Sequence, residues 1–122
     1  MNQAKTQMSP RKISIVLLTI ATAIIHIGLA FYALSLGDMT TLIMFLLNGF
    51  GYLVLLAAYY LPLPVARDHR NLVRWVFIAF TAVTIIGWVA IGSRNTIAYI
   101  DKLVELALIV LLFTDRSKKG SV

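Results

Sequence analysis

Long uncharged segments dominate the chain, and short polar clusters separate them. No Asp, Glu, Lys or Arg occurs from Ile13 to Gly37, from Met39 to Ala66, or from Trp75 to Ser93. As an α-helix that rises about 1.5 Å per residue, each stretch is long enough to cross a hydrocarbon layer of about 30 Å. The pattern therefore predicts three membrane-spanning helices, near residues 13–36, 40–61 and 72–91.

A fourth apolar segment, residues 96–113, carries the charged residues Asp101, Lys102 and Glu105. A charge at the centre of a membrane helix costs about 2.5–3.5 kcal/mol, and each Leu, Ile, Val or Phe returns about 0.3–0.6 kcal/mol. The charges lie in the first half of the segment, and the second half is almost entirely apolar. We therefore expect this segment to insert as the fourth helix of a bundle.

The distribution of basic residues favours four crossings. With four crossings, nine of the 11 Lys and Arg residues lie on one side of the membrane, which the positive-inside rule identifies as the cytoplasm. We expect cytoplasmic tails over residues 1–12 and 114–122, around a single domain of residues 13–113. The nine basic residues are Lys5, Arg11, Lys12, Arg67, Arg70, Arg74, Arg116, Lys118 and Lys119.

Short connections between the predicted helices make consecutive helices antiparallel. Pro62 and Pro64 end the second helix because proline has no backbone N–H, and Asp68 or Asn71 is expected to cap the third. The first apolar segment is longer than the 7–15-residue core of a signal peptide, so we expect it to be retained. The predicted fold is all-α, an up-down four-helix transmembrane bundle of the inner (cytoplasmic) membrane with both termini cytoplasmic.

Composition narrows the function classes. Apolar residues make up 60% of the chain and charged residues 13%, about half the usual share of charge in soluble domains, which excludes an ordinary soluble enzyme. The absence of Cys excludes thiol chemistry, and two His residues without Cys leave little for a transition metal. We expect no catalysis, no cofactor, no metal and no nucleic-acid partner. The expected partners are the lipid bilayer and either a second copy or another membrane protein.

Polar side chains from all four predicted helices fall at one depth in the outer half of the membrane, counted in helical turns. Ionisable groups at such a depth usually face the bundle interior or a wet cavity. The hypothesis is an intramembrane proton- or ligand-binding site. Its candidate residues are His26, Asn48, Tyr52, Thr84, Asp101 and Glu105.

Asp101 and Glu105 share one helix face at i, i+4 spacing and would repel each other. One of them is therefore expected to be protonated, or paired with His26 or Lys102. The structural alternative is an ion pair between Lys102 and Glu105 at i, i+3, with His26 and Asn48 serving only as interhelical hydrogen bonds worth about 0.6 kcal/mol each.

Two other patterns have simpler interpretations. A stripe of small residues on the first helix is typical of close helix packing; it comprises Thr19, Thr22, His26, Ala30 and Ala33. The basic residues Arg67, Arg70 and Arg74 are candidates for contact with anionic lipid headgroups, although a solvated loop explains them equally well.

The segment Tyr99-Ile-Asp-Lys-Leu-Val-Glu105, with its Leu-rich continuation and His26 in the first helix, resembles small prokaryotic four-helix membrane proteins of unknown function. This resemblance implies the same fold and supplies no functional residues. Two functions stay open. The first is a non-catalytic accessory or scaffold subunit that acts through helix–helix contacts. The second is a proton-linked carrier of a small molecule or ion that uses His26, Asp101 and Glu105.

Overall fold

The computed structural model describes residues 9–92 and 94–115, in which all regular structure is α-helical. The all-α prediction is confirmed, and each long helix begins and ends within three residues of its predicted bounds. Residues 1–8 and 116–122 of the predicted tails lie outside the described residues. The helices are α2 (Pro10–Ser35), α3 (Met39–Tyr60), α4 (Pro64–Asp68), α5 (Arg70–Ile91) and α6 (Thr96–Thr114).

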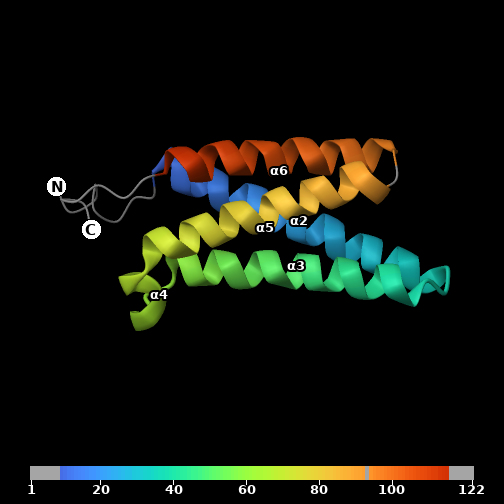
Figure 1. Ribbon diagram of the computed structural model, residues 1–122, viewed down its shortest axis with the longest axis horizontal. Coiled ribbons are helices and arrows are strands. Elements are labelled where there is room, and N and C mark those ends of the chain that lie inside the picture. Colours follow the sequence, from blue (N-terminus) through green and yellow to red (C-terminus); the bar gives the residue numbers. More distant parts are fainter. Residues whose placement is uncertain (1–8, 93, 116–122) are drawn as a thin grey trace.

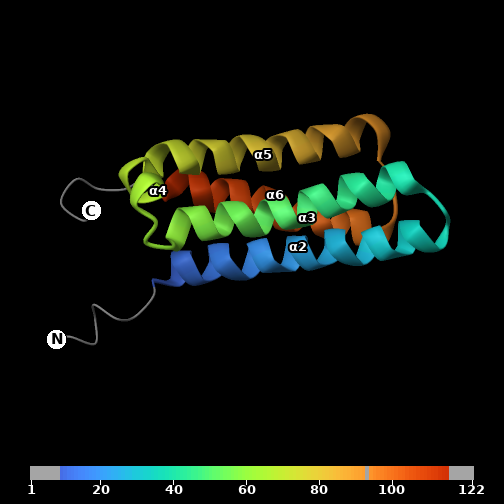
Figure 2. The same cartoon turned by 90° about the horizontal axis from the view of Figure 1, so that it is seen from below.

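The four long helices lie side by side, each antiparallel to its neighbour in the chain (Figure 1 and Figure 2). α2 packs against α3 and α6, and α5 packs against the same two helices. α2 is therefore diagonally opposite α5, and α3 is diagonally opposite α6. The first and last described residues lie at one end of the molecule, where Arg11 Nη1 is 3.4 Å from Asp115 Oδ1.

Three helices, α2, α3 and α5, are long and apolar enough to cross a membrane, which indicates a multi-pass membrane protein. Large apolar side chains on their outer faces are exposed, for example Leu17 (60%), Ile24 (63%) and Val54 (65%). Soluble monomers rarely expose contiguous apolar surface on this scale, so these faces suit lipid. α6 carries three charged residues and is therefore not grouped with the apolar helices α2, α3 and α5. That α6 crosses the membrane, and that both termini are cytoplasmic, stay predictions.

Side-chain caps set the starts of three long helices. Ser9 and Asn95 each accept a hydrogen bond from the backbone N–H three residues further on, at 3.1 and 2.9 Å. Asp38 caps α3 in the same way, at 3.1 Å. Such an oxygen satisfies a backbone N–H that has no partner within the helix. Gly37 has φ +75°, a left-handed conformation that glycine adopts without strain, and it turns the chain from α2 to α3.

The connection between α3 and α5 differs from the prediction. It contains the short helix α4, which Pro64 begins at a position where no backbone N–H is needed. The predicted cap of the next helix by Asp68 or Asn71 is wrong. His69 precedes α5 without a capping side-chain hydrogen bond, and Asn71 lies in the first turn, where its Oδ1 accepts from Arg74.

The interior of the bundle divides into an apolar half and a polar half. The apolar half lies toward the end where the described chain starts and finishes, and the polar half lies toward the α2–α3 and α5–α6 turns. The apolar core consists of Ile15, Ala23, Tyr52, Tyr59, Phe77, Leu108 and Leu112.

Arg74 closes the apolar end of the bundle. It is 3% exposed, and its Nη1 donates to the carbonyl oxygens of Leu112 at 3.0 Å and Phe113 at 3.2 Å, at the end of α6. The guanidinium therefore supplies donors to the last turn of α6; the Leu112 carbonyl also accepts from the backbone N–H of Asp115 at 3.2 Å. This corrects the expectation that Arg74 contacts lipid headgroups. Arg67 is exposed, and Arg70 lies over the ring of Tyr59.

Replacing Arg74 with Met should lower the free energy of unfolding by about 1.5–3 kcal/mol, because a charged hydrogen-bond donor to the end of α6 is lost. Denaturant unfolding of the purified protein in detergent micelles measures this change. Arg67→Met, at the exposed neighbouring position, should stay within about 0.5 kcal/mol of the wild type. Equal effects of the two substitutions would contradict the capping role.

The Thr41 hydroxyl and backbone N–H donate to the Asp38 carboxylate and hold its pKa below the ordinary value of 3.8. A lowered pKa in the folded state means that the ionised form stabilises the start of α3 above pH 3.8, and that this contribution disappears as the pH falls through the lowered value. Hydrogen exchange of the Thr41 amide, corrected for the intrinsic rate, should therefore lose protection on acidification. Asp38→Asn keeps an acceptor oxygen and should remove this pH dependence; an unchanged profile in the variant would refute the assignment.

Candidate functional site

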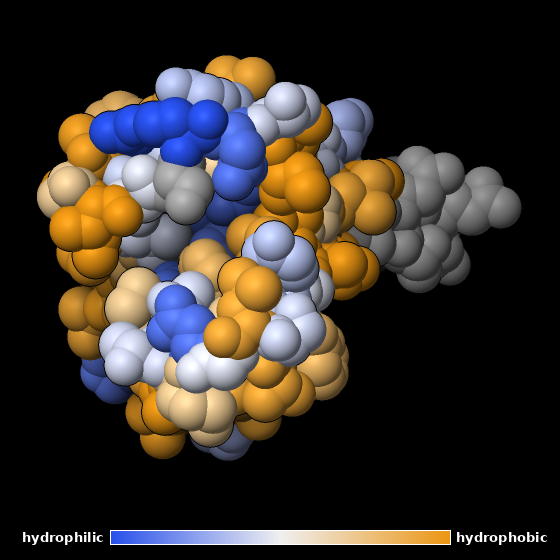
Figure 3. Space-filling model, turned by 90° about the vertical axis from the view of Figure 1, so that its right-hand side faces the viewer, coloured by the Kyte–Doolittle hydropathy of each residue, from blue (hydrophilic) through white to orange (hydrophobic). Residues whose placement is uncertain are grey.

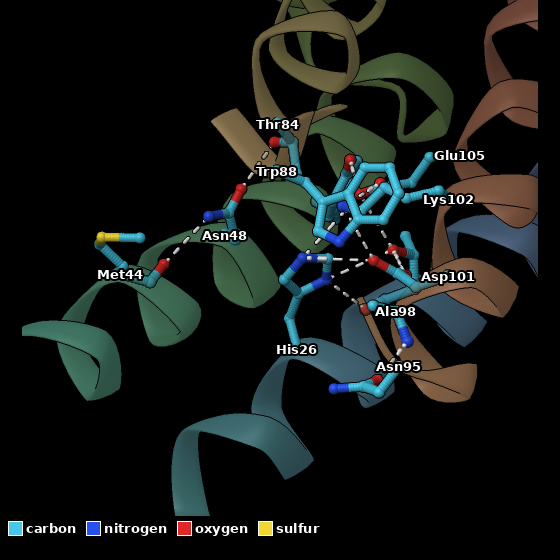
Figure 4. A network of polar contacts seen from close by, with 12 residues as sticks. His26, Met44, Asn48, Thr84, Trp88, Asn95, Ala98, Asp101, Lys102 and Glu105 are labelled. Carbon is cyan, nitrogen blue, oxygen red and sulfur yellow. Dashed lines mark hydrogen bonds and ion pairs between the residues drawn. The ribbon is translucent and has the colours of Figure 1, made fainter. Parts of the chain in front are cut away.

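A buried network of polar side chains joins α2, α3 and α6 in the polar half of the bundle (Figure 4). The side chains of its two carboxylates and its imidazole are each at most 3% exposed. It comprises Thr22, His26, Tyr52, Asp101, Lys102 and Glu105, here called the buried network.

The two carboxylates lie on the face of α6 that packs into the bundle. Buried positions of α6 recur every three or four residues, which is the spacing of one helix face. Asp101 and Glu105 occupy this face one turn apart, and Leu108 and Leu112 continue it into the apolar core. Because Leu108 and Leu112 pack into the core on this same face of α6, the two carboxylates also point into the bundle.

Lys102 bridges the two carboxylates. Its Nζ lies 2.6 Å from Glu105 Oε1 and 3.2 Å from Asp101 Oδ2. The predicted i, i+3 ion pair between Lys102 and Glu105 is confirmed. The ammonium reduces the repulsion between the carboxylates, which would otherwise be strong in a medium of low dielectric constant.

His26 faces the carboxylates with one ring nitrogen and its own helix with the other. Nδ1 lies 2.8 Å from the carbonyl oxygen of Thr22, and a carbonyl can only accept, so we assign the proton to Nδ1. Nε2 lies 3.6 Å from Asp101 Oδ2 and 3.9 Å from Glu105 Oε2. In a neutral ring Nε2 is an acceptor, so it shares no proton with Asp101 Oδ2 or Glu105 Oε2. These two oxygens face other donors, Lys102 Nζ and Tyr52 Oη.

Two hydroxyl groups complete the network. Thr22 Oγ1 lies 2.5 Å from Asp101 Oδ1, and Tyr52 Oη donates to Glu105 Oε2 at 2.6 Å, across the diagonal from α3 to α6. Sequence reasoning missed Thr22, which was interpreted only as part of a packing stripe. Its i, i+4 spacing from His26 was the signal that could have identified it.

Asn48 and Thr84 form a second polar contact beside the buried network (Figure 4). Thr84 Oγ1 donates to Asn48 Oδ1 at 2.7 Å, and Asn48 Nδ2 donates to the carbonyl oxygen of Met44 at 3.1 Å. This pair is half-buried and bridges α3 and α5. The predicted single layer thus divides into two groups, because counting turns gives the height of a residue along its helix but not the direction of its side chain.

The end of the molecule nearer the buried network is hollowed. Figure 3 shows this end, where hydrophilic side chains gather and the surface recedes between the α5–α6 turn above and the α2–α3 turn below. The side chain of Lys102 is 10% exposed, more than its carboxylate partners. Lys102 lies about 9 Å along α6 from the start of the helix at this end.

The charges of the buried network do not balance when His26 is neutral. Two ionised carboxylates then face one ammonium, which leaves one surplus negative charge. A buried charge without compensation costs several kcal/mol. A proton on one of the carboxylates or on His26 Nε2, or another cation between His26 and the carboxylates, removes this cost.

Comparison of the chain with protein-family models, curated proteins and solved structures finds no match. The resemblance to small prokaryotic four-helix membrane proteins stays a prediction.

Replacing Thr22 with Val, which keeps the side-chain shape, should lower the free energy of unfolding by about 1.5–3 kcal/mol because a hydrogen bond to a charged group is lost. The matched control is Thr19→Val. Thr19 is equally buried, but its hydroxyl donates only to the Ile15 carbonyl of its own helix, so this loss should stay near about 1 kcal/mol or below. A Thr22→Val effect no larger than that of Thr19→Val would contradict the role of Thr22 in the network.

Proposed function

We propose that all four long helices cross the cytoplasmic membrane and that both termini are cytoplasmic. α6 has 19 residues, about 28 Å as a helix, and it turns its charged residues toward the bundle interior. Arg67 and Arg70 lie at the same end of the molecule as the first and last described residues (Figure 1). This grouping of basic residues supports the orientation through the positive-inside rule.

We further propose that the protein is a proton-linked carrier of a small cation. The observation that carries this proposal is the convergence of His26 Nε2 on two carboxylates within a network that has one surplus negative charge. A proton on Nε2 completes the charge balance, and so does a cation that takes its place. Two ions that neutralise the same site displace each other, and this competition couples their movements. The proposal includes no catalytic step.

The two ends of the bundle support such a cycle. The buried network lies toward the end where the surface recedes (Figure 3), whereas the opposite end is filled by the apolar core and closed by Arg74. His26 and both carboxylates are at most 3% exposed in the described arrangement, so we propose that the site is reached from the outer side when Lys102 moves. Release to the cytoplasm requires the helices to separate at the core end, as in carriers that alternate the side from which their site is reached.

The accessory-subunit hypothesis has less support. Lipid contact accounts for the exposed apolar side chains of α2, α3 and α5, so these residues do not by themselves indicate a protein partner. Apolar helix faces also suffice for a scaffold, which has no need of a costly group of buried charges. Self-association of the chain stays a prediction.

Proton movement in liposomes tests the carrier proposal. Purified protein is reconstituted with a pH-sensitive dye inside, and inward gradients of Na⁺, K⁺, guanidinium or Mn²⁺ are imposed at equal ionic strength. The wild type should release protons from the lumen with at least one of these cations. Glu105→Gln removes a buried charge worth about 3–5 kcal/mol to its partners, so the rate should fall at least about tenfold.

Asn48→Ala is the matched control, because it removes a polar side chain at the same height that belongs to the neighbouring pair. Its rate should stay within about twofold of the wild type, a difference below 1 kcal/mol. Equal rates in Glu105→Gln and the wild type, or no proton movement with any of the four cations, would refute the carrier function.

A further inference from the structure

His26, Asp101 and Glu105 place three potential metal ligands around one point. One ligand atom from each residue lies within 4.8 Å of the other two, and Nε2 is 3.6 Å from Asp101 Oδ2 and 3.9 Å from Glu105 Oε2. Tetrahedral ligands about 2.1 Å from a metal ion lie about 3.4 Å from one another. Small closing movements of these side chains therefore suffice to give them metal-binding distances.

Each of these three groups is also oriented by a second contact. His26 Nδ1 faces the Thr22 carbonyl oxygen at 2.8 Å, Asp101 Oδ1 faces the Thr22 hydroxyl at 2.5 Å, and Glu105 Oε1 accepts from Lys102 at 2.6 Å. Metal sites hold their ligands in this way, with the second ring nitrogen of a histidine on a carbonyl or carboxylate. The orientation leaves Nε2 as the nitrogen that faces the carboxylates.

We propose that the site binds a divalent first-row transition-metal ion through His26 Nε2, Asp101 Oδ2 and Glu105 Oε2. The role of this metal site rests on the proposed carrier function, because the bound metal would be the cation that the carrier transports. One imidazole nitrogen and two carboxylate oxygens suit Mn²⁺, Fe²⁺ or Zn²⁺. Mg²⁺ and Ca²⁺ prefer oxygen ligands alone, which distinguishes them as controls.

Charge balance assigns a role to Lys102. One divalent ion carries the charge that balances two ionised carboxylates, whereas the Lys102 ammonium balances only one of them. Metal binding therefore competes with the ammonium, which lies 3.2 Å from Asp101 Oδ2 in the described arrangement. Lys102 has a long flexible stem and lies toward the hollowed end, so its ammonium can extend to the outer surface.

A metal titration of the purified full-length protein in detergent, carrying a purification tag without histidine, tests this assignment. Co²⁺ absorption reports binding directly, and competition with Zn²⁺ and Mn²⁺ gives their affinities. We expect one ion per chain and a loss of at least about tenfold in affinity for His26→Gln and Glu105→Gln. His69→Gln is the matched control, because it removes an exposed imidazole at the other end of the bundle.

The Lys102→Met variant distinguishes a metal-binding site from a network that has only a structural role. Removal of the competing ammonium should raise the affinity for Zn²⁺ at least about tenfold, equivalent to about 1.4 kcal/mol. The variant should also gain thermal stability with Zn²⁺ but not with Mg²⁺. These two measurements decide the question even where His26→Gln fails to fold.

Two results would overturn the metal site: unchanged Zn²⁺ affinity in Lys102→Met, or a loss of binding in His69→Gln that matches the loss in His26→Gln. The carrier function fails separately. Metal binding without proton movement in liposomes would refute the carrier and keep the site. Proton exchange with Na⁺ or K⁺ in a protein that binds no transition metal would refute the site and keep the carrier.

Discussion

Compensation of buried charge is the interaction on which the rest of the structure depends. Asp101 and Glu105 lie inside a bundle whose outer faces suit lipid, where an unpaired carboxylate costs several kcal/mol. Lys102 from the same helix, His26 from α2 and Tyr52 from α3 face these two groups. α6 is stable beside its apolar neighbours only when these contacts form, so the buried network fixes the rotation of α6 in the bundle.

The two halves of the interior make different contributions. In the apolar half, packed side chains and the hydrogen bonds of Arg74 to the end of α6 hold α5 and α6 together. In the polar half, a gain or loss of one charge changes the interactions of α2, α3 and α6 at once. An ion that binds there therefore acts on three helices, and the apolar half is the part that must yield if the site is to open on the other side.

The sequence predicted most of the fold because charge-free segments and capping residues mark helix ends directly. It also predicted that His26, Asn48, Thr84 and Glu105 share one height, since rise per residue is constant along a helix. Asp101 was placed one turn above this height and Tyr52 one turn below it. It could not predict which side chains turn toward each other, because that depends on how the helices rotate as they pack. It therefore did not distinguish the Asn48–Thr84 pair, which joins α3 and α5, from the contacts that join α2, α3 and α6.

The way the helices pack also explains the other differences between the sequence-based predictions and the structure. Arg74 belongs to the basic cluster in the sequence, and only the position of the end of α6 beside α5 makes it a cap rather than a surface residue. Thr22 has the same small size as its neighbours in the stripe, so its hydroxyl becomes informative only when Asp101 is placed opposite. The short helix α4 follows from Pro64, which ends one helix and can equally begin another.

The protonation of the His26 ring nitrogens tests the central claim most directly. ¹⁵N NMR of histidine-labelled protein in lipid, with His69 replaced by Gln so that one imidazole remains, distinguishes the two nitrogens across a pH series. We predict that the neutral ring carries its proton on Nδ1, because Nδ1 donates to the Thr22 carbonyl, and that Nε2 is the unprotonated nitrogen that faces the carboxylates. A neutral ring with its proton on Nε2 and none on Nδ1 would contradict the claim that Nε2 faces the two carboxylates as an acceptor.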